Sequence, residues 1–561
     1  MRLLPASRLW RLLSTRNSVF SDIDIRAASS ARRSVLELIE LNTSLRTCGE
    51  GLEPLLAFGK DAQRWKRLVA HAATTSDVHL GLSMFQAQRI LRFGGVPASL
   101  THRLAAHILH LHSTTALPDP VVLAEMCCHL GVAQTDMAEY FAAADSFKRG
   151  FAALQSAGVD SDDVAGGQKI WVRVCLKFHF GRLLSKGAGL NRGYEMQARI
   201  QLEQALAECL LLPRGRDAEL FTAEVKAALS LVLTTQTQAV FVQAEQLVVE
   251  AIETQEAAGD VTSLTESLNN FGMLLARQGR RAESRQAFHR NLKLRRRIFP
   301  GGIAHMDVAE ALMNTASLEP APEKALPLYL EAVDILESIV SAATHDQETS
   351  SPTATATATV TATPTPNDMM ALVLAPALDG LGVTLGQLSR LDEAIGVFKR
   401  ALDIRRSKLR RHRDTATSAS NLAHVICLAA FRDPESKLRK RQPSLMERLL
   451  GRGTEDSDKL DAAAAASAEA DSLMKEAVDI LRHLDPQSQA LAEALCQRAE
   501  VLMQCRGALT GENTEVGRAG EDESRALLGE ALEILVRELG DEHASVQHAK
   551  ALLESVNGRG Q

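Results

Sequence analysis

The chain has 561 residues, and 63 Lys and Arg stand against 69 Asp and Glu, so its formal net charge is −6. A hydrophobic content of 45% excludes global disorder, and the lack of an overall basic excess argues against nucleic-acid binding over the whole chain. Eight cysteines without any CxxC spacing indicate neither a disulfide framework nor a zinc ribbon. Aromatic residues make up only 4%, and Ala and Leu dominate the apolar set, which favours an all-α fold.

The N-terminal segment, residues 1–33, differs in charge from the rest of the chain. It holds seven Arg against Asp22 and Asp24, and residues 1–21 contain no acid at all. An Arg-rich, Ser-containing start with an apolar cluster around Trp10 is typical of a mitochondrial transit peptide, although a disordered basic tail is the alternative. We therefore expect a mitochondrial protein, soluble in the matrix or peripheral to a membrane, because no later run is apolar enough for a transmembrane segment.

The next segment, residues 34–115, is helical by its pattern but carries no clear repeat. We expect degenerate repeats that cap the helices after residue 115.

A pair of helices is predicted most clearly between residues 378 and 401. An apolar stripe with helical spacing defines the first helix: Leu378, Leu381, Gly382 and Leu385. After a turn near Ser389, a second stripe of small, bulky and small residues follows: Ala394, Phe398 and Ala401. Small residues let two antiparallel helices approach closely, and we expect the bulky side chain to fill the space between neighbouring hairpins.

This small–bulky–small frame recurs eight times in order, at intervals of 40 to 76 residues. Its members are Ala143/Phe147/Gly150, Ala198/Leu202/Ala205, Ala244/Val248/Ala251, Ser284/Phe288/Asn291, Ala325/Tyr329/Ala332, Ala394/Phe398/Ala401, Ala470/Met474/Ala477 and Ser524/Leu528/Ala531.

The recurring hairpin resembles the tetratricopeptide repeat. The intervals of 40 and 41 residues and the connectors "FPGGIAHMDVAEALMN" and "LGDEHASVQHAKALL" are similar to the long repeats of the kinesin-light-chain type. The resemblance implies an all-α solenoid of about eight repeats.

The predicted solenoid is interrupted by segments of unusual composition. We expect one repeat block at 118–345, a Thr/Ala/Pro low-complexity spacer at 346–370, and a second block at 371–556 with a charged insertion at 432–461.

Motifs for catalysis or cofactor binding are missing from the sequence. It has no phosphate loop, HExxH or GxSxG motif, and "GAGLNRG" at 187–193 lacks the spacing of a dinucleotide site. The histidines at 107, 110 and 112 and the neighbouring Cys127, Cys128 and His129 favour helix-surface histidines and buried thiols over a metal site. We expect no enzyme, cofactor or metal.

Two basic clusters follow second-helix frames at the same offset. They comprise Arg295, Arg296 and Arg297, and Arg405, Arg406 and Arg410. One interpretation is an anion-binding ridge for RNA phosphates or an acidic partner. The other is solvated cations near helix C-termini, which the helix dipole favours.

A row of amides precedes first-helix stripe residues: Asn270, Asn314, Asn421 and Gln497. In kinesin-light-chain-like proteins, the resemblance implies that such residues line the concave groove and bind the backbone of a peptide. An amide both donates and accepts hydrogen bonds and therefore suits this role. Local hydrogen bonding near a helix start is the alternative.

These features predict a non-catalytic scaffold or assembly factor that binds protein partners in its groove, in mitochondria. A mitochondrial RNA-associated factor that uses the basic ridges is a second hypothesis. A cytosolic, kinesin-light-chain-like cargo adaptor is a third.

Overall fold

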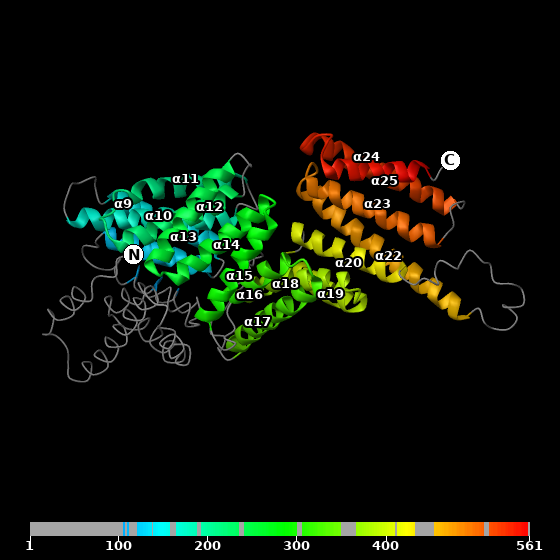
Figure 1. The fold of residues 1–561 in the computed structure, drawn as a ribbon, viewed down its shortest axis with the longest axis horizontal. Coiled ribbons are helices and arrows are strands. Elements are labelled where there is room, and N and C mark those ends of the chain that lie inside the picture. The colour runs from blue at the N-terminus through cyan, green and yellow to red at the C-terminus, as the bar shows by residue number, and fades with distance from the viewer. Residues whose placement is uncertain are drawn as a thin grey trace, which may run out of the picture. The chain divides into compact units, whose positions relative to one another are not determined.

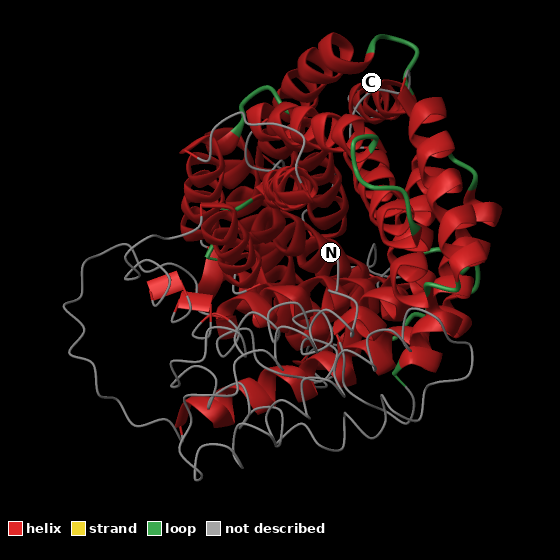
Figure 2. Ribbon diagram, turned by 90° about the vertical axis from the view of Figure 1, so that its left-hand side faces the viewer, coloured by secondary structure: helices red, strands yellow, loops and turns green. Residues whose placement is uncertain are grey.

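The structure is a computed structural model in which every described element is a helix, as Figure 2 shows. It describes residues 102, 105–106, 109–110, 120–136, 139–156, 164–187, 192–234, 240–299, 306–348, 366–409, 412–431, 454–509 and 515–558. The predicted targeting segment, 1–33, and nearly all of the predicted N-terminal helical region, 34–115, lie outside these residues. Within the described residues, no helix is long and apolar enough to cross a membrane.

The chain divides into two compact units, each of which is described by itself. Unit 1 comprises Met1–Leu318 with Thr355–Pro366, and unit 2 comprises Glu319–Ala354 with Asn367–Gln561.

Unit 1 contains nine described helices in consecutive antiparallel arrangement (Figure 1). They are α8 (Pro120–Asp136), α9 (Tyr140–Ser156), α10 (Val164–Gly187), α11 (Arg192–Cys209), α12 (Arg216–Thr234), α13 (Phe241–Ala258), α14 (Val261–Arg277), α15 (Arg281–Ile298) and α16 (Met306–Ser317). Each even-numbered helix from α8 to α14 packs against the helix that follows it, so the unit consists of hairpins.

Unit 2 contains eight described helices. They are α17 (Pro322–Glu348), α18 (Pro366–Gln387), α19 (Leu391–Leu409), α20 (Arg413–Phe431), α22 (Thr454–Leu484), α23 (Gln489–Leu509), α24 (Glu515–Leu539) and α25 (Ala544–Gly558). The helices α20 and α22 pack together, as do α23 and α24.

The eight predicted frames form the core of the second helices. They lie on α9, α11, α13, α15, α17, α19, α22 and α24, and every residue of the eight frames is buried. The prediction of an all-α helical-hairpin solenoid is confirmed, because each frame places its small–bulky–small stripe against a neighbouring helix.

The bulky residue of a frame lies against a glycine of the first helix. A Cβ added to Gly131, Gly272 or Gly382 would lie 2.6–2.8 Å from a ring carbon of Phe147, Phe288 or Phe398, respectively. In these three hairpins the ring fills space inside its own hairpin. The ring of Phe147 also packs against that of Phe180 on α10, with 5.9 Å between the ring centroids, so it reaches the next hairpin as expected. The ring of Tyr329 on α17 also reaches the next hairpin, where it contacts Gly380 of α18.

The division between the units falls between α16 and α17, N-terminal to the predicted spacer. The contacts of α17 explain its place in unit 2. Besides the contact of Tyr329 with Gly380, Glu337 of α17 forms an ion pair with Arg400 of α19. Pro322 is the first residue of α17. Proline is tolerated at this position because a backbone N–H there would have no partner within the helix, so its absence costs nothing.

Both segments of unusual composition are partly helical. Residues 346–348 end α17, residues 366–370 begin α18, and residues 454–461 of the predicted insertion begin α22. The remainder, 349–365 and 432–453, lies outside the described residues.

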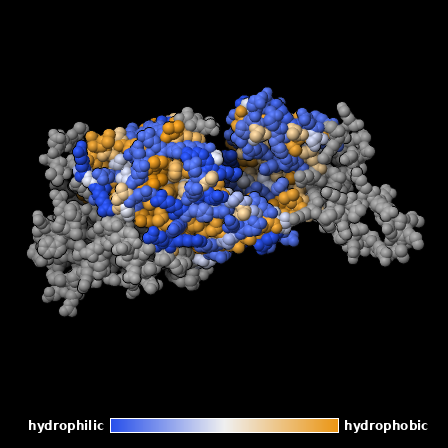
Figure 3. All heavy atoms as spheres, viewed as in Figure 1, coloured by the Kyte–Doolittle hydropathy of each residue, from blue (hydrophilic) through white to orange (hydrophobic). Residues whose placement is uncertain are grey.

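The described surface is a mosaic of hydrophilic and hydrophobic residues (Figure 3). Among the residues that the structure describes, the three most exposed large hydrophobic side chains are Phe141, Leu210 and Val242. All three belong to unit 1, where they lie on or directly beside second helices.

Candidate functional site

The first helix α14 presents one exposed stripe of mixed chemistry. Glu266, Asn270, Met273 and Arg277 recur at helical spacing, and all four reach solvent, while Leu268, Gly272 and Leu275 on the opposite side are buried. On α16, Glu310 and Asn314 occupy similar places, exposed and half-buried respectively. We call these six solvent-reaching residues the first-helix face of unit 1.

The two predicted groove asparagines of unit 1 tie neighbouring first helices together. Asn270 Nδ2 donates to the backbone oxygen of Ala227 on α12 at 3.1 Å, and Asn314 Nδ2 donates to Asn269 Oδ1 on α14 at 2.8 Å. Neither sequence interpretation named this role, because each bond joins residues more than 40 positions apart. The Nδ2 groups are thus engaged inside the protein, while both carboxamide oxygens can still accept a hydrogen bond.

Asn269 and Glu310 belong to the same network, and sequence analysis missed both. Asn269 Nδ2 donates to Glu310 Oε1 at 3.2 Å. The signal was the position of Glu310 one turn before Asn314, on the same side of the helix.

The amide row does not continue as a hydrogen-bonded ladder in unit 2. Asn421 on α20 is half-buried and Gln497 on α23 is exposed, and neither side chain forms a hydrogen bond in the described part of the chain. In α18 the position that corresponds to Asn270 is Gly380, because the ring of Tyr329 occupies the space that a side chain would need. The polar face is therefore a property of unit 1.

The leading arginine of each basic cluster is buried, so it is not available to an anion at the surface. Arg295 and Arg405 are each 5% exposed. Arg295 pairs with Asp307 of α16 at 2.6 Å, and its Nε donates to Asn291 Oδ1 at 3.1 Å.

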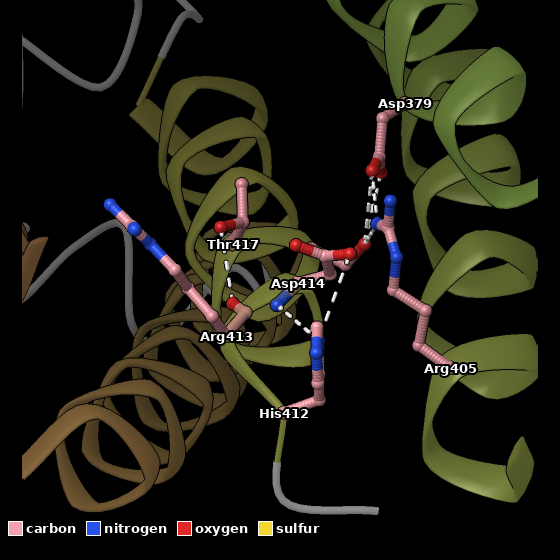
Figure 4. Close-up of polar contacts among 7 residues, drawn as sticks. Asp379, Arg405, His412, Arg413, Asp414 and Thr417 are labelled. Carbon is pink, nitrogen blue, oxygen red and sulfur yellow. Dashed lines mark hydrogen bonds and ion pairs between the residues drawn. The ribbon is translucent and has the colours of Figure 1, made fainter. Parts of the chain in front are cut away.

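Arg405 pairs with Asp379 of α18 and donates to Ser418 of α20. Figure 4 shows Arg405 and Asp379 pointing toward one another, and Arg413 at the start of α20 pointing away from both. Burial raises the pKa of Asp379, although Arg405 and Ser418 oppose this. The carboxylate therefore loses more hydration than its partners return.

The frame itself explains this burial. Four residues after the last frame residue, every repeat has a buried side chain: Leu154, Cys209, Gln255, Arg295, Leu336, Arg405, Leu481 and Leu535. Both clusters begin four residues after a frame, and this is a core position. The leucines that other repeats have at the same position could have revealed this from the sequence.

The remaining cluster residues lie at the surface or outside the described chain. Arg296 and Arg297 are exposed, and Arg406 is exposed but paired with Glu476 of α22, to which its Nε donates at 3.1 Å. Arg410 lies outside the described residues. Because Arg295 and Arg405 are buried, two of the six arginines in the predicted anion-binding ridge cannot contact an anion at the surface.

The cysteines and histidines of α8 show no arrangement for a metal. Cys127, Cys128 and His129 are buried, and burial raises the pKa of both thiols. Among the described residues, which include His110 but neither His107 nor His112, no three His, Cys, Asp or Glu are grouped to hold an ion.

Two segments match the tetratricopeptide repeat family: residues 264–301, which span α14 and α15, and residues 375–414, which span α18 and α19. Together with the hairpin architecture, these matches indicate an all-α helical-repeat protein in which two segments are similar to tetratricopeptide repeats. Proteins of this kind generally act as non-catalytic scaffolds for protein interaction. No curated protein matches the chain.

Three solved structures are similar to parts of the chain. A Rap protein complexed with competence and sporulation factor has 10% identity and a TM-score of 0.37, over 86% of this chain and 99% of that one. A signal transduction ATPase with a tetratricopeptide repeat sensor from Pyrococcus horikoshii has 11% identity and a TM-score of 0.40, over 86% of this chain and 74% of that one. BtubC from P. vanneervenii has 15% identity and a TM-score of 0.29, over 47% of this chain and 95% of that one.

Proposed function

We propose that this protein is a scaffold that holds a segment of a partner protein against the first-helix face of unit 1. The observation that carries the proposal is the hydrogen-bonded row of Asn270, Asn314 and Glu310, which reaches solvent on two neighbouring first helices. Hydrogen bonds to the neighbouring helices α12 and α14 hold these side chains in place, so their free acceptor groups are ordered before a partner binds.

Apart from Arg277, which donates through Nη1 to the backbone oxygen of Thr234 at 2.8 Å, the polar groups of the face favour a partner that donates hydrogen bonds. The amide nitrogens of Asn270 and Asn314 are used within the protein, whereas their oxygens and the carboxylates of Glu266 and Glu310 are acceptors. The exposed Met273 between them adds an adaptable apolar contact. An extended segment with available backbone N–H groups meets these requirements.

The proposal is tested best with Met273→Asp, because the asparagines also join helices and their removal would disturb the fold. The matched control is Val383→Asp, which lies at the corresponding position of α18 and is also exposed. Full-length chains are captured from fractionated cells and their partners are identified by mass spectrometry. We expect Met273→Asp to lose proteins that the wild type and Val383→Asp retain. Equal partner sets for all three chains would contradict the proposal.

We also propose that the protein works in mitochondria, on the strength of the Arg-rich and acid-poor composition of residues 1–33. A full-length fluorescent fusion should enter mitochondria, and the same fusion without residues 1–33 should stay in the cytosol. A cytosolic full-length fusion would contradict this proposal and would favour the cargo-adaptor hypothesis.

The RNA-associated alternative has less support than the scaffold. Burial of Arg295 and Arg405 removes the leading cation of each predicted ridge, and Asp307 and Asp379 neutralise them.

A further inference from the structure

The second helix α15 carries a row of four cations along one winding ridge: Arg281, Arg285, Lys293 and Arg297. We call these residues the α15 cation row. Three of them are exposed, Arg285 is half-buried, and none forms an ion pair in the part of the chain that the structure describes. Their spacing of four or eight residues extends the row over about 24 Å of helix.

The fold does not require this row. The helix α19 carries the same frame 110 residues later, and its corresponding positions hold Leu391, Ile395, Asp403 and Ser407. The N-terminal half of the row also disfavours its own helix. Arg281 and Arg285 lie in or next to the first turn, where the helix dipole disfavours positive charge, and like charges at i and i+4 repel each other.

Other cations of these helices show how the protein neutralises such charges. On α19, Lys399 pairs with Glu469 at 3.0 Å, and Arg406 pairs with Glu476, both of α22. The two glutamates are seven residues apart and therefore lie on one side of that helix.

The same device operates at α15. Arg280, the residue just before this helix, pairs with Glu245 of α13 at 2.7 Å, and Arg290 of α15 pairs with Glu256 of α13. In both regions, cations at one second helix form ion pairs with glutamates that lie at helical spacing on a neighbouring helix.

We propose that the α15 cation row docks an acidic helix of a partner protein, which presents carboxylates at about every fourth residue along one side. A partner helix of this kind would supply to Arg281, Arg285, Lys293 and Arg297 what α13 and α22 supply to their neighbours. RNA fits less well, because the only Phe, Tyr or Trp ring of α15, that of Phe288, is buried and cannot stack on a base.

This inference goes beyond the proposed function and does not depend on it. The row lies on a second helix, whereas the proposed partner segment contacts the first helices α14 and α16. Either surface can therefore fail its own test without affecting the other.

The test measures binding of a synthetic helical peptide with Glu at every fourth position to the full-length protein, by fluorescence anisotropy at low and high salt. The variant replaces the row with Arg281→Gln, Arg285→Gln, Lys293→Gln and Arg297→Gln. The control variant carries Lys399→Gln, Arg400→Gln and Arg406→Gln, which removes cations that are already paired within the protein. Circular dichroism verifies that both variants are folded.

We expect the row variant to bind the peptide about 10- to 30-fold more weakly at low salt, because four helix-type ion pairs are lost. High salt should remove most of the difference, and the control variant should bind like the wild type. Equal binding by the wild type and the row variant would overturn the proposal.

Two further probes make the partner class falsifiable. A peptide of the same composition, with its glutamates spread around the helix, should bind more weakly than the one-sided peptide, and equal affinity would overturn the helical partner. A single-stranded RNA oligonucleotide should bind more weakly than the one-sided peptide. If RNA bound more tightly than the peptide and the row variant abolished this binding, the acidic-helix proposal would be overturned in favour of RNA.

Discussion

The helices α15 and α19 have the same frame and the same buried arginine, yet they neutralise charge differently. In α19 the buried Arg405 pairs with Asp379 of the preceding helix and donates to Ser418 of the following one. In α15 the buried Arg295 pairs with Asp307 of the following helix and donates to Asn291 of its own. The position in the repeat determines burial, whereas the neighbouring helices determine which group neutralises the charge.

The surfaces of the two helices differ in the same way. The exposed cations Lys399, Arg400 and Arg406 of α19 each have a glutamate on a neighbouring helix, whereas the α15 cation row has none in the described chain. The two repeats therefore share their core positions but differ in the charges on their outer sides, and this is where partners can be distinguished.

The largest expected effect separates the two buried arginines. Asp379→Ala should lower the free energy of unfolding by about 3–5 kcal/mol, because Arg405 is left buried without its carboxylate. Asp307→Ala should cost clearly less, since the Asp307 side chain is 26% exposed against 14% for Asp379, and water can reach the partner group. Urea unfolding at neutral pH measures both changes.

The double variant Asp379→Leu with Arg405→Leu is the control for this comparison. It should recover most of the loss, because Leu fills the corresponding position in four other repeats. A loss for Asp379→Ala no greater than for the exposed Asp403→Ala would show that Arg405 is not held as described.

The next effect tests whether the two hairpins have equally close helices. Gly272→Ala and Gly382→Ala should each lower the free energy of unfolding by about 1–3 kcal/mol, because the new Cβ would lie 2.6–2.8 Å from a phenylalanine ring. Thermal and urea unfolding measure the change. Gly396→Ala on the exposed side of α19, with nothing within 4 Å, should instead stabilise by about 0.5–1 kcal/mol. Stabilisation by all three substitutions would refute the close approach.

A smaller difference is expected at the turns before the two helices. Gly279 and Ser389 occupy corresponding positions and have φ of 77° and 67°, a conformation that suits glycine. Ser389→Gly should therefore stabilise the protein by about 1 kcal/mol, and Gly279→Ser should destabilise it by a similar amount. Thermal unfolding of both variants provides the check, and equal signs for the two changes would contradict the equivalence.

The smallest effect concerns the exposed cations. Arg406→Gln should cost roughly 0.2–1 kcal/mol, since it breaks a partly exposed ion pair with Glu476. Arg297→Gln should change the free energy of unfolding by less than about 0.5 kcal/mol, because Arg297 has no ion pair to lose in the described chain. A larger loss for Arg297→Gln than for Arg406→Gln would show that the α15 cation row contributes to folding.

The sequence alone was sufficient for the helical-hairpin fold. The eight frames, with glycines such as Gly272 and Gly382 on the first helices, combine helical spacing with small residues that only close antiparallel packing can bury. This information is local, because a stripe at i, i+4 and i+7 lies on one side of a helix whatever its neighbours are.

Only the tertiary structure decided what the charged and amide side chains do. Arg295 and Arg405 face inward, Asn270 reaches a backbone oxygen 43 residues away, and α17 joins the second unit. Each outcome depends on groups that distant segments bring together. A long polar side chain can reach solvent or a buried partner from the same backbone position, and the choice depends on whether a neighbouring helix offers that partner.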